Sequence, residues 1–258
     1  MKERLVVFDI LGKIAHFRKF YTNSSSLTYD LPPPTVIRGM IAAILGIERD
    51  GYYDLLSPER TRIAASIHQP GRRFMQTINY IRTNKNDFSN PRHILARFLS
   101  GARVPYQVPM EVLLPLDQGS SLKYRIYFQH TDGAIMRMLK DQMASGFSVY
   151  PLYFGISEFI ADFQYRGERD YELRQGIADR ISSMVNGEKL NERGIDLCAS
   201  QGCQFVKERM PAAFKQGREL LKVSSFIYER SGRPFTADVS EYAVVSSDDG
   251  LPDHIVFI

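Results

Sequence analysis

The sequence predicts an α+β protein whose larger part is a ferredoxin-like domain. Its first 166 residues show strand and helix patterns in the order strand, helix, strands, helix, strand, which is the ferredoxin-like order. Residues 122–129 alternate between apolar and mostly polar side chains, as in a strand with one buried face. The chain has 258 residues, 44% of them hydrophobic, which is enough for a full core. We therefore expect an antiparallel sheet with two helices on one face.

A strand and a helix frame the first polar loop. Residues 5–10 form an apolar run, and residues 36–45 form a largely apolar helical segment. Pro34 suits a first helical turn, Thr35 is expected to cap it, and Gly46 is expected to end the helix. The N-terminal region is therefore a strand, a loop and a buried helix.

Small residues mark one face of this helix. Gly39, Ala42, Ala43 and Gly46 recur at helical spacing. Small side chains let a helix lie close to a sheet. We expect this face to pack on the sheet.

The other elements are predicted from period and turn residues. A second helix is expected over about 132–143, with Asp132 as its N-cap. A turn is expected at residues 69–72, Gln-Pro-Gly-Arg. Further strands of this domain are expected at residues 61–68, 74–81, 107–114, 122–129 and 158–165.

The pattern changes after residue 166. Acids and bases are mixed there, which favours a solvated helical face or a linker. Strands are expected at 223–229 and 242–246, with a third at 255–258. We therefore divide the chain into residues 1–166 and a small C-terminal β-rich part, residues 167–258.

The loop after the first strand is rich in cations, aromatic rings and small polar side chains. Lys13, Arg18 and Lys19 meet no acid before Asp30. Their aromatic neighbours are Phe17, Phe20 and Tyr21, and four small polar residues follow at 23–26. This composition beside a helix N-terminus suits a phosphate chain with exposed bases. A solvated loop with an aromatic plug into the core is the alternative.

A second basic segment spans about residues 81–108. From Gly71 to Arg103 the chain has seven Lys or Arg and one acid, Asp87. A long insertion between two strands is uncommon unless it is functional. A loose basic surface loop is the alternative, because such loops are common.

Several motifs resemble one protein family. They are KIAHFRKFYT (13–22), LPPPTVIRG (31–39), AILGIERD (43–50), VYPLYFGISEFIAD (149–162), ERMP (208–211), GREL (217–220) and FIYERSGRP (226–234). They resemble CRISPR-associated proteins of the Cas five family, most closely the type I-B branch. The resemblance implies a RAMP-superfamily, RRM-like fold with a protruding β-hairpin, the thumb, at about 81–108. It also implies a subunit of the Cascade complex that caps the 5′ handle of the CRISPR RNA (crRNA). Its expected partners are the backbone subunit, the large subunit and target DNA near the PAM.

Combining the loops with the resemblance gives a set of expected RNA contacts. Cations would bind phosphates, aromatic rings and polar groups would take splayed bases, and Arg38 would approach the same phosphates from the first helical turn. The set is His16, Arg18, Lys19, Tyr21, Asn23, Ser24, Ser25, Ser26, Arg38, Arg72, Arg73, Arg82, Lys85, Arg92, Arg97 and Arg103.

Two other functions compete with RNA binding alone. A metal-independent endoribonuclease would need a base, an acid and a cation. Histidine-centred sets that supply these are His16 with Lys19 and Tyr21, and His130 with Lys123 and Tyr127. Standard catalytic motifs are absent from the sequence, and the type I-B resemblance implies a non-catalytic subunit without a cofactor or metal. A protein-interaction scaffold whose basic loops contact only DNA is the third hypothesis.

The remaining signals concern the compartment. Cys198 and Cys203 lack the partners of a zinc site and are expected to be reduced thiols. The N-terminal apolar run is too short for a signal peptide, and no run approaches a membrane span. We expect a cytoplasmic protein with no membrane partner.

Overall fold

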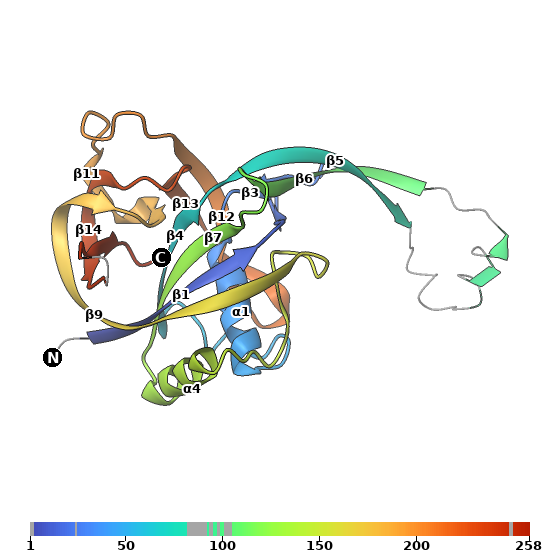
Figure 1. The fold of residues 1–258 in the computed structure, drawn as a ribbon, viewed down its shortest axis with the longest axis horizontal. Coiled ribbons are helices and arrows are strands. Elements are labelled where there is room, and N and C mark those ends of the chain that lie inside the picture. Colours follow the sequence, from blue (N-terminus) through green and yellow to red (C-terminus); the bar gives the residue numbers. More distant parts are fainter. Residues whose placement is uncertain are drawn as a thin grey trace.

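The computed structural model describes residues 3–23, 25–81, 92, 95–96, 99–100, 105–247 and 250–258. These residues form a mostly β structure with two main helices, which confirms the α+β class (Figure 1). In the described part of the chain, the largest sheet has eight strands in the order β11-β14-β15-β9-β1-β7-β4, with β8 paired to β9.

Four adjacent strands form one end of the large sheet. They are β1 (Glu3–Gly12), β4 (Thr61–Gln69), β7 (Leu122–His130) and β9 (Ile160–Ile181). β1 pairs antiparallel with β7 on one side and with β9 on the other, and β4 pairs antiparallel with β7. The alternation seen in the sequence of β7 is confirmed, because Leu122, Tyr124, Ile126 and Phe128 all lie in the main core.

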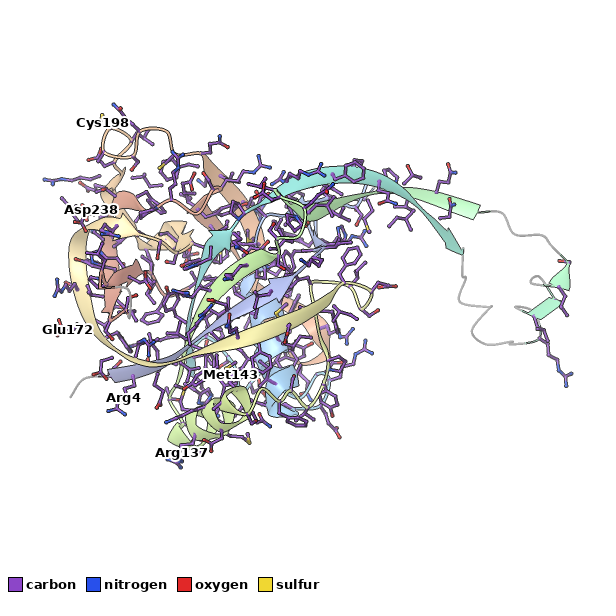
Figure 2. All side chains as sticks on the ribbon, viewed as in Figure 1. Arg4, Arg137, Met143, Glu172, Cys198 and Asp238 are labelled. Atoms are coloured by element: carbon purple, nitrogen blue, oxygen red, sulfur yellow. The ribbon has the colours of Figure 1, made fainter. Side chains whose placement is uncertain are left out.

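Helices α1 (Pro34–Leu45) and α4 (Gly133–Ala144) cover that core face. The predicted N-cap of α4 is confirmed, since Asp132 accepts a hydrogen bond from the backbone of Ala134 at 2.7 Å. Leu139 is buried under α4, whereas Arg137 lies on the outer, polar side of the helix (Figure 2).

The start and the small face of α1 differ from expectation. Pro33 occupies the N-cap without a side-chain hydrogen bond, so Thr35 is not the cap. Gly46 ends the helix at φ 74°, as predicted. The expectation that Gly39 packs on the sheet is wrong, because an added Cβ would meet the Tyr52 hydroxyl at 3.3 Å. The larger side chains of α1, such as Ile37 and Ile41, instead pack in the main core with residues of the sheet.

The strand expected at 158–165 is much longer in the structure. β9 continues through the mixed-charge segment to Ile181, so the prediction of a helical face or linker there is wrong. Its first half pairs with β1 and its second half with β14, Phe235–Val245. Residue 166, the expected boundary between two parts, falls inside this strand.

The C-terminal residues fold back over the second face of the sheet. Phe257 and Val245 join Val7 and Tyr127 in a separate core cluster on that face. The remaining strands and short helices are β8 (Leu152–Tyr153), β10 (Val185–Asn186), η1 (Gly187–Lys189), β11 (Leu190–Ile195), β12 (Phe205–Lys215), η2 (Gln216–Arg218), β13 (Glu219–Glu229) and β15 (Asp253–Ile255).

A two-stranded ribbon projects from the body (Figure 1). It consists of β5 (Gly71–Ile81) and β6 (Pro105–Pro115), which pair in one unbroken register. In place of the four-residue turn expected at 69–72, the single residue Pro70 connects β4 to β5. β5 pairs with β6 rather than with β4. Gly71 is required at the base, because an added Cβ would lie 2.9 Å from the Leu114 carbonyl oxygen and 2.5 Å from the Leu122 side chain. The other residues of the basic segment, apart from five single positions, lie outside the described residues.

Among the described residues, no helix combines the length and the apolar character needed to cross a membrane.

Candidate nucleic-acid interface

The loop after β1 is fastened along β6. It contains the short strands β2 (Phe17–Arg18) and β3 (Thr28–Tyr29), which pair with each other. Ala15 exchanges backbone hydrogen bonds of 3.1 and 2.8 Å with Leu113. The N–H of Ser26 donates to the carbonyl of Pro109 at 2.9 Å. The basic loop and the ribbon base therefore form one surface.

His16 is a structural residue of this surface. It is 3% exposed, and its Nδ1 lies 2.7 Å from the Glu111 carbonyl, to which it donates. Its Nε2 lies 2.8 Å from the hydroxyl of Ser26. Burial lowers the pKa of His16, which favours the neutral ring. The expectation that His16 contacts RNA is corrected, because both ring nitrogens are engaged inside the protein.

Glu208 on β12 pairs with two residues of the loop. Lys19 is 6% exposed and forms an ion pair with one oxygen of Glu208. Contrary to expectation, it is therefore not available to bind phosphates. Tyr21 donates from its hydroxyl to the other oxygen at 2.8 Å. Desolvation and this hydrogen bond raise the pKa of Tyr21 to about 12. The ring of Tyr21 nevertheless remains 49% exposed, next to Phe20.

Arg73 is committed to a second buried acid. Its Nε and Nη2 donate to the two carboxylate oxygens of Asp30 at 2.8 and 2.7 Å. The hydroxyl of Tyr228 also donates to Asp30, at 2.9 Å. The hydrogen bond and charge of Asp30 raise the pKa of Arg73 despite its partial burial. Arg73 therefore links the ribbon to the loop through Asp30. Because its guanidinium group is paired with Asp30, Arg73 is less available to RNA phosphates than expected.

Arg38 does not reach the loop surface. Its side chain is buried, and Nη1 donates to the carbonyl of Ala212 at 2.7 Å. Burial lowers the pKa of Arg38 to about 10. The expected phosphate contact is wrong, because β12 covers the first turn of α1 and takes the guanidinium group.

The remaining expected contacts divide into three groups. Arg18, Asn23, Arg72 and Arg92 are exposed. Ser25 and Ser26 are half-buried. Ser24, Arg82, Lys85, Arg97 and Arg103 lie outside the described residues.

The structure brings one cation to the loop, Arg209, that sequence reasoning missed. Lys207 and Arg209 on β12 are exposed on either side of Glu208. Arg209 lies close enough to Tyr21 for its charge to act on the Tyr21 hydroxyl. By itself this charge lowers the pKa of Tyr21, but the larger effects of desolvation and Glu208 raise it. The run Lys207-Glu208-Arg209 could have indicated a charged surface strand. It lies some 190 residues from the loop, so the sequence alone could not show that the two are neighbours. Arg209 therefore adds to the exposed positive charge that Arg18 contributes to the loop.

The second histidine considered for catalysis is also enclosed. His130 is 5% exposed, and its Nε2 lies 2.8 Å from the carbonyl of Leu55. Its Nδ1 accepts the backbone N–H of Asp132 at 2.8 Å. The ring therefore orders the start of α4.

A family model decides the assignment. The model described as CRISPR-associated protein (Cas_Cas5) matches residues 5–179, which is more than half of the chain. This chain belongs to the Cas5 family of CRISPR-associated proteins. No match was found among curated proteins.

Two solved structures to which this chain is similar are described as CRISPR proteins or complexes. A CRISPR protein from Archaeoglobus fulgidus has a TM-score of 0.56 and 14% identity, over 97% of this chain and 98% of that one. A chain of a CRISPR RNA-guided surveillance complex has a TM-score of 0.47 and 12% identity, over 92% and 91%. The first similarity supports the same fold for this Cas5 protein.

Proposed function

We propose that this Cas5 protein is a non-catalytic RNA-binding subunit of a type I-B Cascade complex that caps the crRNA 5′ handle. One observation carries the proposal. The exposed ring of Tyr21 packs against the exposed ring of Phe20 and is fixed by Glu208, with exposed Arg18 on the same loop and exposed Arg209 close enough for its charge to act on the Tyr21 hydroxyl. Cations that take phosphates beside rings that stack bases are typical of single-strand RNA binding.

The buried pairs support this role by ordering the loop in advance. Lys19 with Glu208 and Arg73 with Asp30 leave the two acids neutralised, so they repel phosphates less. An ordered loop loses less conformational entropy when RNA binds. The exposed side chains Arg18, Phe20 and Tyr21 can therefore bind RNA without first having to order the loop.

The topology supports a ferredoxin-like domain with a thumb. The central order is β9-β1-β7-β4, with α1 after β1 and α4 after β7, which is a split βαβ arrangement. The β5–β6 ribbon leads into and out of residues 81–108, the range in which the family resemblance expects the thumb. We propose that it grips the guide RNA together with the backbone subunit, in a ferredoxin-like domain over 1–166 followed by a β-rich part over 167–258.

The remaining parts of the proposal rest on the resemblance. The sequence motifs favour the type I-B branch, and the large subunit and target DNA near the PAM are the further proposed partners. A cytoplasmic location follows from such a complex.

The metal-independent endoribonuclease is less well supported. A general base must reach the 2′-hydroxyl of the substrate. His16 and His130 each have both ring nitrogens hydrogen-bonded within the protein, and neither is accessible. The two proposed catalytic sets therefore lack a base that can contact RNA in this conformation.

Co-purification tests the proposal. The chain is expressed with a type I-B CRISPR array and its processing enzyme, with and without the backbone subunit, and the 5′ ends of bound RNA are sequenced. We expect one defined 5′ end. RNA with scattered ends, or no RNA, would contradict handle capping.

A second arm tests catalysis. The purified chain is incubated with repeat RNA in the presence of a chelator. A product with a 2′,3′-cyclic phosphate end would favour the endoribonuclease, and intact RNA would support the non-catalytic subunit.

A further inference from the structure

The end of β13 carries an arginine that belongs neither to the loop nor to the ribbon. Arg230 lies in the segment 226–234, one of the motifs found in the sequence. Its neighbours have partners inside the protein, since Tyr228 donates to Asp30 at 2.9 Å and Glu229 is buried and hydrogen-bonded. Arg230 differs from them, because 37% of its side chain is exposed. Among the described residues, its guanidinium group makes no hydrogen bond.

Arg230 shares the carboxylate of Asp30 with Arg73. The two oxygens of Asp30 accept from Nε and Nη2 of Arg73 at 2.8 and 2.7 Å, and one of them also accepts the Tyr228 hydroxyl. Nε of Arg230 lies 3.7 Å from the same carboxylate, which is beyond hydrogen-bond distance. The charge of Asp30 therefore holds Arg230 beside Arg73, but leaves the N–H groups of Arg230 available to a ligand.

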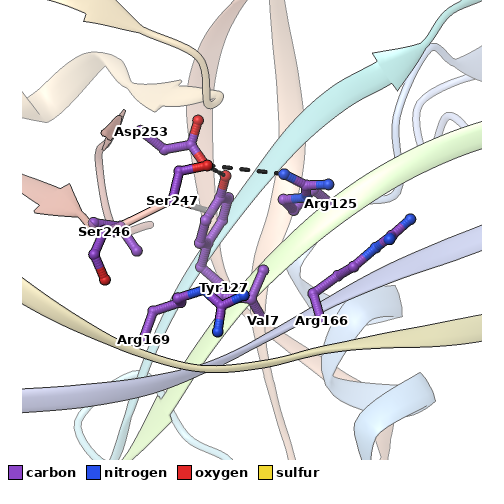
Figure 3. A pocket seen from close by; sticks show the side chains of 9 residues that line it. Val7, Arg125, Tyr127, Arg166, Arg169, Ser246, Ser247 and Asp253 are labelled. Carbon is purple, nitrogen blue, oxygen red and sulfur yellow. Dashed lines mark hydrogen bonds and ion pairs between the residues drawn. The ribbon is translucent and has the colours of Figure 1, made fainter. Parts of the chain in front are cut away.

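A second shared carboxylate of the fold is used differently. Buried Asp9 accepts from Arg125 Nε at 2.8 Å and from Arg166 Nε at 2.7 Å. Figure 3 shows both arginines at the lining of a cavity, where Arg125 also lies 4.0 Å from Asp253. Both arginines of that site are hydrogen-bonded to their shared acid, whereas only one of the two arginines at Asp30 is.

Short contacts connect Arg230 to the exposed ring of Tyr21. Asp30 joins Arg230 to Arg73, and Nη2 of Arg73 lies 4.0 Å from Glu208. Glu208 in turn accepts the Tyr21 hydroxyl at 2.8 Å. The charge of Arg73 also acts on that hydroxyl, where it favours a lower pKa of Tyr21. A single strand stacked on Tyr21 therefore has two further guanidinium groups next to it on the same surface.

The acids along this path lie deeper than the arginines. The side chains of Asp30 and Glu208 are 5% and 11% exposed, compared with 28% for Arg73 and 37% for Arg230. Glu208 is also paired with Lys19. A ligand that approaches from solvent therefore meets the guanidinium groups before the carboxylates, and this order favours an anion.

We propose that Arg230, beside Arg73, binds a backbone phosphate of the RNA strand that stacks on Tyr21, through its guanidinium fork. Arginine offers five N–H groups in a planar arrangement that matches two phosphate oxygens. The inference rests on the proposed function, because the ligand is RNA. It adds a contact from the C-terminal part of the chain, outside the residues 5–179 that the family model matches.

The test compares two single variants of the full chain. Binding of a fluorescent oligouridine is measured by anisotropy at several salt concentrations. Arg230→Gln should weaken binding about tenfold, the effect of losing a charged hydrogen bond. It should also lower the salt slope by about 0.7, the value for one phosphate on a single strand. Arg218→Gln is the matched control and should bind like the wild type, because Arg218 is an exposed arginine at the opposite end of the β12–β13 hairpin, paired with Asp50 at 2.9 Å.

A conservative variant separates the fork from simple charge. Arg230→Lys keeps a cation beside Asp30, so it should keep the salt slope but bind more weakly than the wild type. Wild-type affinity of this variant would overturn the bidentate contact. If thermal melts show that Arg230→Gln is unfolded, the lysine variant carries the test alone.

The outcomes distinguish the two proposals. Unchanged affinity and slope in folded Arg230→Gln, with weaker binding by Arg18→Gln, would overturn the Arg230 contact and leave the loop interface intact. Absence of RNA binding by the wild-type chain would overturn both. Unchanged RNA binding by Arg230→Gln, with loss of the backbone subunit in pull-down assays, would mean that Arg230 meets an acid of a protein partner, and would also overturn the proposal.

Discussion

At the scale of residues, cations of the same loop have different roles. Lys19 is buried against Glu208, whereas Arg18, one position earlier, is exposed. A buried pair that loses one partner leaves the other charge desolvated, which is costly. Lys19 therefore contributes to the stability of the loop, and Arg18 is available to phosphates.

This difference gives a first prediction. Arg18→Gln with Arg72→Gln should lower the salt slope of RNA binding by about 1.4, as two single-strand phosphate contacts are lost. Lys19→Gln should leave the slope unchanged and instead lower the free energy of unfolding by about 1–3 kcal/mol. Anisotropy titrations and urea unfolding measure the two effects. A slope change in Lys19→Gln would mean that this lysine leaves Glu208 to meet RNA.

The carboxylate of Asp9 gives a second prediction. Asp9→Asn should lower the free energy of unfolding at pH 7 by about 3 kcal/mol, because it breaks the ion pairs of buried Asp9 with Arg125 and Arg166. This value is near the lower end for a broken buried pair, since both arginine side chains are partly exposed to water. The folded-state pKa of Asp9 lies below its usual value, so its stabilisation is complete above about pH 4. That stabilisation is lost as the pH falls through the folded-state pKa.

Urea unfolding at pH 7 and near pH 3 measures this dependence. The gap between the wild type and Asp9→Asn should shrink in acid. Asp162→Asn, an exposed acid of the neighbouring strand β9, is the control and should have a small effect at both pH values. An equal gap at both pH values would show that Asp9 stabilises the fold without its charge.

At the scale of elements, α1 shows how position decides the role of a glycine. Gly39 has an ordinary helical backbone, and an added Cβ there would lie 3.3 Å from the Tyr52 hydroxyl. Gly46 has a φ of 74°, and a Cβ there would meet Val149 at 2.9 Å. Only the second glycine is required by the backbone.

The third prediction follows from these two glycines. Gly39→Ala should change the free energy of unfolding by about 0.5–1 kcal/mol in the stabilising direction, because alanine favours the helix. Gly46→Ala should be destabilising by more than about 1 kcal/mol, because it forces a left-handed alanine. Chemical denaturation of both variants provides the measurement, and equal stability of the two would contradict the capping role of Gly46.

At the scale of the whole molecule, the body and the ribbon are built differently. The body buries two sheet faces, one under α1 and α4 and the other under the C-terminal residues. The two strands of the ribbon pair with each other, the part of β6 near the body also bonds the loop after β1, and Phe74 and Met75 are exposed. Its outer part therefore adds little to the core.

The fourth prediction separates these parts. Residues 78–108 are replaced by Asn-Gly, a two-residue hairpin turn that joins the paired positions Thr77 and Pro109. The shortened chain should unfold cooperatively at nearly the wild-type temperature, as followed by circular dichroism. It should lose binding to the backbone subunit and to guide RNA in pull-down assays. Retention of both would show that the ribbon is not a thumb.

The sequence by itself determined the local elements of this Cas5 protein. The two-residue alternation of β7, the Asp132 cap and the Gly46 stop all appear in the structure. These features depend on neighbours within a few residues, so local steric and hydrogen-bonding rules are sufficient to predict them. The family motifs likewise lie in continuous segments.

Only the tertiary structure decided which cations are exposed and which are buried against partners. Glu208 lies 189 residues from Lys19, and Ala212 lies 174 residues from Arg38. The charges of β9 resembled a solvated helix, but pairing with β1 and β14 made the segment a strand. Partners this distant meet only after the sheet forms, and tertiary pairing then overrides local preference. The sequence therefore located the basic loop, and the fold selected the side chains available to RNA.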